Sequence, residues 1–185
     1  NGFSQRRRHW IKSFSENQEI NKDNLFKHIL REPEKDWNNF EAIITRPIKV
    51  NNTKKMKILK RGWKSLIKDP KILFNKKKQN ILLHFDMHHG HGNLQKAISE
   101  IDKKDREEFD YFVKSKCEFN PHIMYISKND ILDEWFKTLF TWLEKCEKIF
   151  GLNNLRGYDT GRIYAYLAER YASFWFKKYT KFKEH

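Results

Sequence analysis

The segment from Asp86 to Asn93 (DMHHGHGN) holds the densest group of side chains in this sequence that can do acid–base or ligand chemistry. Three histidines and one aspartate lie within six residues, and two glycines let a backbone approach a ligand closely. Asp86 and His89 are the predicted catalytic residues, because the proton of an attacking hydroxyl group must be accepted as its oxygen attacks. The predicted substrate contacts in this segment are His88, His91 and Asn93.

Two other interpretations of the same segment stay open on the sequence alone. Asp86, His88 and His91 can ligate a divalent ion, Mn²⁺ or Mg²⁺, which would steady a leaving diphosphate. Their spacing is not diagnostic, so no residue is assigned as a metal ligand. The segment can also be a polar loop that is held by its own hydrogen bonds and binds nothing.

A second cluster, Gln5 to His9, directly follows Gly2-Phe3, which resembles the end of a strand. Arginines bind pyrophosphate through charge-assisted, often bidentate hydrogen bonds. Alternate residues of an extended chain share a face, so Arg6 and Arg8 are predicted to point to the site. The alternative is a solvated basic segment. The predicted substrate contacts here are Gln5, Arg6, Arg8 and His9.

A charged pair, Glu169-Arg170, lies within an aromatic helix predicted over 160–179. Arg170 falls near the apolar face of that helix, where a charge needs a partner or a ligand. We predict that Glu169 is a further catalytic residue near the acceptor, and the alternative is a structural ion pair. Asn120 and His122 precede a predicted strand and can be aimed at a ligand, whereas a plain turn is the alternative there. The further predicted substrate contacts are Asn120, His122, Arg162 and Arg170.

Composition favours one globular domain over residues 1–185, because 38% of the residues are hydrophobic and 34% are charged. The net charge of +14 attracts polyanions, so a basic nucleic-acid-binding module is the alternative function; we expect no nucleic acid, since none of the usual binding motifs is present. Cys117 and Cys146 form neither a disulfide framework nor a zinc spacing. With no apolar run near the ~20 residues that cross a membrane, a cytoplasmic protein is predicted.

Hydrophobic periodicity predicts an α/β fold. Strands are expected at 2–3, 41–50, 81–85 and 122–127, with Pro47 at an edge or a strand end. Helices are expected at 24–30, from Leu94 to Ile101, and at 129–150, where Gly151 ends the helix.

The stretch from 51 to 79 is a basic excursion from the domain, with an amphipathic helix and scattered apolar residues. Such a piece can lie on an anionic membrane surface, peripheral to the inner membrane. The alternative is a solvated basic face over an ordinary apolar contact.

Taken together, GFSQRRRHW, EAIITRPI, the histidine segment, FNPHIMYISKNDILDEWFKTLFTWLEKCEK and GRIYAYLAERYASFW resemble an uncharacterised glycosyltransferase family from bacterial capsule and O-antigen gene clusters. The resemblance covers nearly the whole chain and is firmest at 2–9 and 166–175. Arg6 stands where that family commonly has Tyr, Pro121-His122 replaces Met-Phe, and 51–79 has no counterpart.

This resemblance implies a GT-A-like single domain, a mixed sheet flanked by helices, whose N-terminal nucleotide-binding part is absent from the chain. It implies transfer of a sugar from a nucleotide-sugar donor to a saccharide or lipid-linked saccharide acceptor, in capsule or lipopolysaccharide biosynthesis. Gln5 to Arg8 would then occupy the place of the usual metal-binding acidic pair, with arginines as the counter-charge of the diphosphate.

Overall fold

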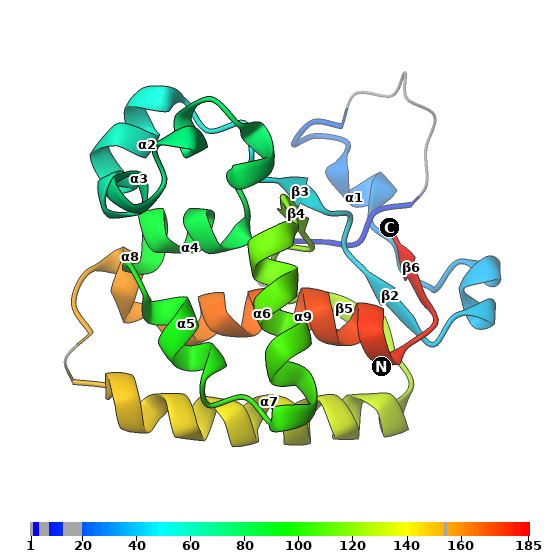
Figure 1. Ribbon diagram of the computed structural model, residues 1–185. Helices are drawn as coiled ribbons and strands as arrows, with labels where there is room; N and C mark the ends of the chain where they lie inside the picture. The colour runs from blue at the N-terminus through cyan, green and yellow to red at the C-terminus, as the bar shows by residue number, and fades with distance from the viewer. Residues whose placement is uncertain (1, 4–7, 13–19, 154) are drawn as a thin grey trace.

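The computed structural model describes residues 2–3, 8–12, 20–153 and 155–185. Two of the predicted substrate contacts, Gln5 and Arg6, lie outside these residues. The described part is a mixed α/β structure in which helices pack around a small sheet (Figure 1).

The sheet has four short strands in the order β1-β5-β2-β6. They are β1 (Gly2–Phe3), β2 (Ala42–Ile44), β5 (Tyr125–Ser127) and β6 (Phe182–Glu184). β5 runs antiparallel to β1 and β2, while β6 runs parallel to β2. The sheet is therefore mixed, as predicted, and strands far apart in the sequence form its centre.

The predicted strand over 41–50 is two strands separated by a break at Pro47. β2 ends at Ile44, and β3 (Ile48–Lys49) pairs with β4 (Glu118–Phe119) in a separate two-stranded sheet. Proline has no N–H to donate to a ladder, which explains why the first strand stops before it.

Helix α9 (Ile163–Tyr179) forms the centre of the core, with α7 (Asn129–Phe150) beside it (Figure 1). α7 presents one apolar stripe to α9 and ends at Gly151, whose φ of 65° suits glycine. Trp135 of α7 donates its indole N–H to the Tyr125 hydroxyl at 2.8 Å, which satisfies its one polar atom inside the core. A third long helix is α6 (Lys103–Ser115). Short helices elsewhere in the domain include α1 (Leu25–His28), α5 (Asn93–Ile98), α8 (Tyr158–Gly161) and the 3₁₀ turn η1 (Lys35–Asn39).

The predicted strand at 81–85 is wrong: these residues begin helix α4 (Ile81–His89). Asn80 caps the helix, because its side-chain oxygen accepts the N–H of Leu83 at 2.9 Å. α4 is in contact with α2, α5 and α6, so its apolar residues are buried on several sides and show no helical periodicity. A short apolar run of this kind cannot be distinguished from a buried strand by pattern.

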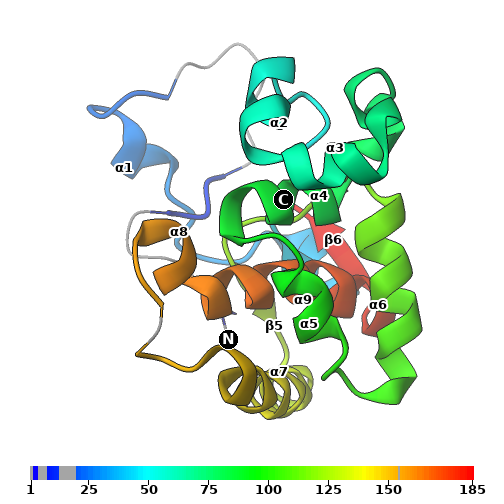
Figure 2. The same cartoon turned by 60° about the vertical axis from the view of Figure 1, so that its left-hand side comes forward.

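The basic excursion, residues 51–79, is helical and packs against the rest of the domain. It contains α2 (Lys55–Arg61), α3 (Trp63–Lys68) and the 3₁₀ turns η2 (Pro70–Leu73) and η3 (Lys76–Lys78). Ile58 and Ile72 join Leu83 and Met87 of α4 in a small second core. Both views place α2 and α3 beside α4, at the end of the molecule away from α7 (Figures 1 and 2). None of the helices in the described part of the chain is long and apolar enough to cross a membrane.

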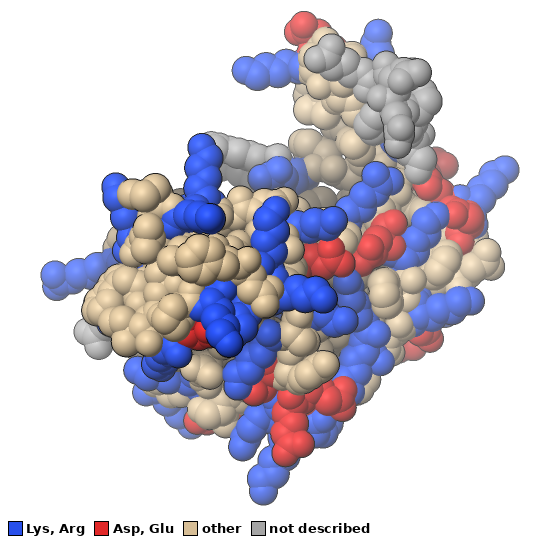
Figure 3. Space-filling model, turned by 45° about the horizontal axis from the view of Figure 1, so that its top comes forward, with Lys and Arg blue, Asp and Glu red and all other residues tan. Residues whose placement is uncertain are grey.

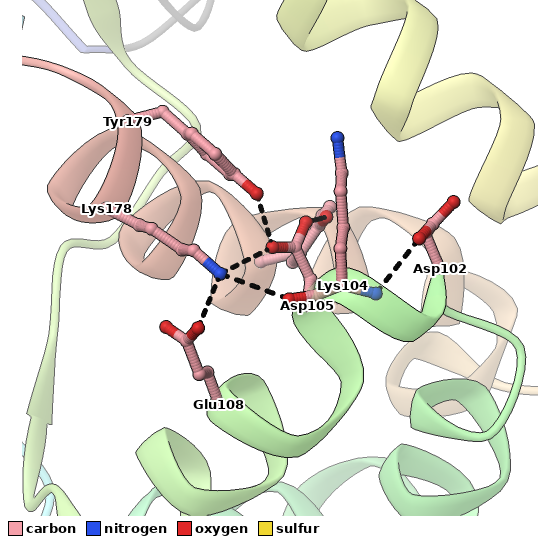
Figure 4. A network of polar contacts seen from close by, with 7 residues as sticks. Asp102, Lys104, Asp105, Glu108, Lys178 and Tyr179 are labelled. Carbon is pink, nitrogen blue, oxygen red and sulfur yellow. Dashed lines mark hydrogen bonds and ion pairs between the residues drawn. The ribbon is translucent and has the colours of Figure 1, made fainter.

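A buried carboxylate, Asp105, ties α6 to the end of α9 (Figure 4). It accepts hydrogen bonds from the hydroxyls of Tyr171 (2.8 Å) and Tyr179 (2.5 Å) and from the ammonium of Lys178 (2.9 Å). Burial alone would raise the pKa of Asp105, but these three hydrogen bonds outweigh it and lower the pKa below its ordinary value.

Replacing Asp105 with Ala should lower the free energy of unfolding by about 3 kcal/mol, because the buried Tyr171 hydroxyl loses its acceptor and Lys178 loses one of its two carboxylates. Urea denaturation would measure this. Asp110→Ala is the control on the same helix: its partly exposed pair with Lys114 should contribute at most about 0.5 kcal/mol. Equal losses in the two variants would contradict the assignment.

Candidate active-site cleft

A cleft of about 480 Å³ opens where three strands of the sheet end. Thr45 and Arg46 follow β2, and His122 and Met124 come just before β5. The register pairs Ile44 with both Tyr125 and Glu184, so these segments and His185 after β6 meet at one edge. The sheet thus gathers chain segments from near 45, 122 and 185 into one site.

The fourth wall of the cleft is the segment from Arg8 to Lys12. Its Ile11 forms an antiparallel bridge with Ile29, and Lys12 donates its backbone N–H to the His28 carbonyl at 2.8 Å. This pairing holds the segment against the domain and places two basic side chains and His9 at the opening.

Positive charge dominates the cleft. Arg8, Lys12 and Arg46 are exposed, and the described residues that line the cleft include no Asp or Glu. Such a surface attracts an anionic ligand, and guanidinium groups suit phosphate oxygens in particular.

Trp10 gives the cleft an aromatic wall. Its ring lies 6.1 Å from Trp37 and 5.9 Å from His185, between ring centres. Within the described part of the chain, the buried indole N–H of Trp10 has no hydrogen-bond partner. A flat apolar surface can receive a nucleobase or a sugar ring.

His122 lies in a turn with unusual backbone geometry. His122 and Ile123 have φ of 78° and 48°, in the left-handed region that side chains rarely adopt, least of all β-branched ones. The Glu169 carboxylate accepts the His122 backbone N–H at 2.6 Å, and the Thr45 hydroxyl donates to the Pro121 carbonyl at 2.8 Å. Strained residues of this kind persist where the surroundings fix them, and they concentrate at functional sites.

The buried ion pair of Glu169 and Arg170 lies behind this turn. The sequence predicted Glu169 as a catalytic residue and Arg170 as a substrate contact. Arg170 is 1% exposed; it pairs with Glu169 and donates to His84 Nδ1 at 3.2 Å. Its guanidinium also lies 4.0 Å from the centre of the Phe119 ring. Burial, and then the charge of Arg170, lower the pKa of His84 to about 2, so His84 is neutral and accepts the hydrogen bond.

The imidazole of His122 is close to the same carboxylate, with 4.0 Å between Nδ1 and Glu169 Oε1. Burial and the charge of Arg8 lower the pKa of His122, and the negative charge of Glu169 opposes them. The net lowering keeps His122 neutral near pH 7, the form that can accept a proton.

The histidine segment is not the loop that the sequence predicted. Asp86, His88 and His89 belong to α4, and only 90–92 connect it to α5. Asp86 accepts the Gly92 N–H at 3.0 Å and lies 3.1 Å from His91 Nδ1, which places its carboxylate in the α4–α5 turn. Burial raises the pKa of Asp86 above its ordinary value, although the contacts with Gly92 and His91 lower it in part. Asp86 and Glu169 were both predicted as catalytic residues, and neither is among the residues that line the cleft.

The other side chains of this segment also make contacts within the fold. His89 is buried and stacks on Tyr166 of α9, with ring centres 3.7 Å apart. His88 Nδ1 is 3.4 Å from Arg61 of α2. Asn93 donates its amide N–H to the His89 carbonyl at 2.9 Å and so closes the turn. The open alternative of a hydrogen-bonded structural segment describes these residues best.

No metal centre forms from the predicted ligands. Among the described residues, no group of three or more His, Cys, Asp and Glu side chains is arranged to hold a metal ion. His88 and His91 lie beside Arg61 and Ser65 respectively, and no carboxylate lines the cleft among the residues that the structure describes. The donor set does not fit Mn²⁺ or Mg²⁺, which prefer oxygen ligands.

Asn120 and Arg162 are not among the residues that line the cleft. Asn120 is buried, where it exchanges hydrogen bonds with the Ser173 hydroxyl and donates to the Thr45 carbonyl. It therefore supports the wall of the cleft from behind. Arg162 is exposed, directly precedes α9 and lies over the Tyr158 ring at 4.6 Å.

Sequence reasoning missed several members of the site. The lining residues that it did not assign are Trp10, Ile11, Lys12, Thr45, Arg46, Met124 and His185. Thr45 and Arg46 directly follow a clear strand pattern, and polar residues after a strand end were the one signal that could have found them.

Comparison with known proteins gives one match. A family model described as a domain of unknown function (DUF4422) matches residues 2–181. No curated protein and no solved structure matches the chain. Because the match spans almost the whole sequence, the chain belongs to the DUF4422 family.

Proposed function

We propose that this protein is a cytoplasmic glycosyltransferase of GT-A-like fold, which moves a sugar from a nucleotide-sugar donor to a saccharide or lipid-linked acceptor in capsule or lipopolysaccharide biosynthesis. The observation that carries the proposal is the cleft itself. It combines exposed guanidinium groups, an aromatic wall and a neutral histidine beside a fixed carboxylate. The sequence resemblance to a glycosyltransferase family points the same way.

In this proposal the basic side chains hold the donor. Arg8 and Arg46 bind the diphosphate, with Lys12 as a further counter-charge at the same opening. Trp10 stacks on the base or the sugar ring. These contacts fill the role that a metal ion plays where acidic ligands are present.

His122 accepts the proton. The oxygen of an acceptor hydroxyl attacks the anomeric carbon of the donor sugar, the bond from that carbon to the diphosphate oxygen breaks, and the hydroxyl proton passes to the imidazole. The nucleoside diphosphate leaves with its negative charge balanced by Arg8 and Arg46. Glu169 orients the His122 turn and stabilises the imidazolium that forms.

Donor binding tests the proposal directly. A panel of nucleotide sugars is screened by thermal shift, where a ligand at about 100 times its dissociation constant adds ~2.7 kcal/mol of stability. Arg8→Ala and Arg46→Ala should each weaken binding of the hit about 10- to 150-fold, since each removes a charge-assisted contact of ~1.5–3 kcal/mol.

Arg156→Ala, at an exposed arginine outside the cleft lining, is the matched control and should leave donor affinity unchanged. If no nucleotide sugar stabilises the protein, the proposed function is wrong. If Arg8→Ala and Arg46→Ala lower the melting temperature but leave donor affinity intact, the two arginines have a structural role.

A further inference from the structure

Five large apolar side chains of the excursion face outward, and we name them the apolar patch. Their exposed fractions are 63% for Met56, 44% for Leu59, 51% for Trp63, 72% for Ile67 and 82% for Phe74. Four of them come from α2 and α3, which are in contact with each other. Soluble domains seldom leave so many large apolar side chains of one short segment in water, so this surface calls for a partner.

The residues of the apolar patch do not contribute to the hydrophobic core. The excursion already has inward residues, Ile58 and Ile72, which are buried against Leu83 and Met87 of α4. Trp63 and Ile67 are four residues apart on α3 and so share its opposite, outward face. The excursion thus has two apolar faces, and only one of them is used within the fold.

Positive charge surrounds this outward face. Residues 51–79 contain ten lysines and one arginine against one acidic residue, Asp69. That aspartate is paired with Lys78. Two of the lysines lie beside patch aromatics, with Lys64 Nζ 5.7 Å from the Trp63 ring centre and Lys55 Nζ 5.4 Å from that of Phe74. Figure 3 looks toward this end of the molecule, where Lys and Arg side chains border a broad uncharged surface.

We propose that the apolar patch and its lysines bind the surface of an anionic lipid bilayer. The apolar side chains enter the boundary between headgroups and acyl chains, while the lysines contact lipid phosphates. Trp63 and Phe74 suit that depth, since aromatic rings favour the membrane interface. The inference is independent of the chemistry in the cleft.

A bilayer fits this face better than a nucleic acid does. A single-stranded nucleic acid uses aromatic planes for stacking and cations for phosphates, but it gives aliphatic side chains little to bind. Met56, Leu59 and Ile67 are three of the five patch residues, and their burial contributes only where an apolar medium is available.

Sedimentation with vesicles tests the proposal. The full chain should bind vesicles of equimolar phosphatidylcholine and phosphatidylglycerol, and bind pure phosphatidylcholine far more weakly, because each lysine near an anionic surface adds about fivefold. Brominated acyl chains should quench the fluorescence of Trp63. Four of the other tryptophans, Trp37, Trp135, Trp142 and Trp175, are at most 5% exposed, and Trp63→Phe should remove most of the quenching while keeping the binding.

Matched variants separate the two parts of the surface. Trp63→Ser with Ile67→Ser should weaken binding to the anionic vesicles about tenfold or more, whereas Tyr111→Ser, which changes a 70% exposed side chain on α6, should not. Lys60→Gln with Lys64→Gln should weaken binding to the anionic vesicles about 25-fold, because each of the two lysines contributes about fivefold. The control, Lys145→Gln with Lys148→Gln on α7, should leave this binding unchanged.

Several outcomes would overturn the proposal. One is no binding to the anionic vesicles, and another is binding that Trp63→Ser with Ile67→Ser leaves unchanged, since the apolar patch would then have no role. A third is tight binding to single-stranded RNA that the serine variant abolishes while vesicle binding persists, which would assign the surface to nucleic acid.

Discussion

Replacing His122 with Asn should lower the turnover of the proposed transfer by about 10²- to 10⁴-fold, the usual contribution of a general base. Asn is the informative substitute because it tolerates the left-handed backbone at this position, where φ is 78°, yet it cannot take up the proton. Donor affinity and melting temperature should stay near those of the parent. Single-turnover kinetics at saturating donor would measure the effect.

The pH profile gives this prediction a second readout. A base with a lowered pKa stays neutral to more acidic pH, so turnover should fall only below the ordinary histidine range near 6.5. Arg8→Gln removes a positive charge that disfavours the imidazolium, which raises the pKa of His122 and should move the acid limb to higher pH. An unmoved limb would contradict the role of His122 as base.

Asp86→Asn is the control that separates the two hypotheses for the base. The sequence favoured Asp86, which would predict a collapse of turnover in this variant. The structure places the Asp86 carboxylate in the α4–α5 turn, beside Gly92 and His91, so turnover should survive. If Asp86→Asn is inactive and His122→Asn is active, the base assignment is wrong.

Elements with one clear periodicity could be predicted from the sequence. The apolar stripe of α7 and the glycine at 151 gave the right helix and its right end, and the β-branched run before Pro47 gave β2. α4 could not be predicted, because the apolar residues among 81–85 show no helical periodicity and only the cap by Asn80 distinguishes helix from strand.

The site was harder to predict than the fold for a physical reason. The cleft depends on the pairing of Ile44 with Tyr125 and with Glu184, contacts between residues 81 and 140 positions apart. No local pattern encodes that register. His122 and Glu169 were both predicted, but as members of separate clusters, and their hydrogen bond joins a turn to a helix. Conversely, the dense histidine segment drew attention because of its composition, although its polar groups contact one another and residues of α2, α3 and α9.

The buried pair behind the His122 turn should dominate the stability of the site. Arg170→Met should lower the free energy of unfolding by about 3–5 kcal/mol, because it leaves the Glu169 carboxylate without its counter-charge in a mostly buried place. Lys114→Met, which breaks a partly exposed ion pair on α6, should cost at most about 0.5 kcal/mol. Urea denaturation measures both.

The double variant Glu169→Gln with Arg170→Met decides whether the pair acts through its charge. The amide has no charge to leave uncompensated, and its oxygen can still accept the His122 N–H, so the double variant should be more stable than Arg170→Met alone. If the losses in free energy of unfolding of Glu169→Gln and Arg170→Met simply add in the double variant, the two side chains act independently. Because Gln keeps the hydrogen bond to the His122 N–H but lacks the negative charge that stabilises the imidazolium, turnover of the double variant should stay low although its stability returns. Recovery of turnover together with stability would show that the charge of Glu169 has no part in the transfer.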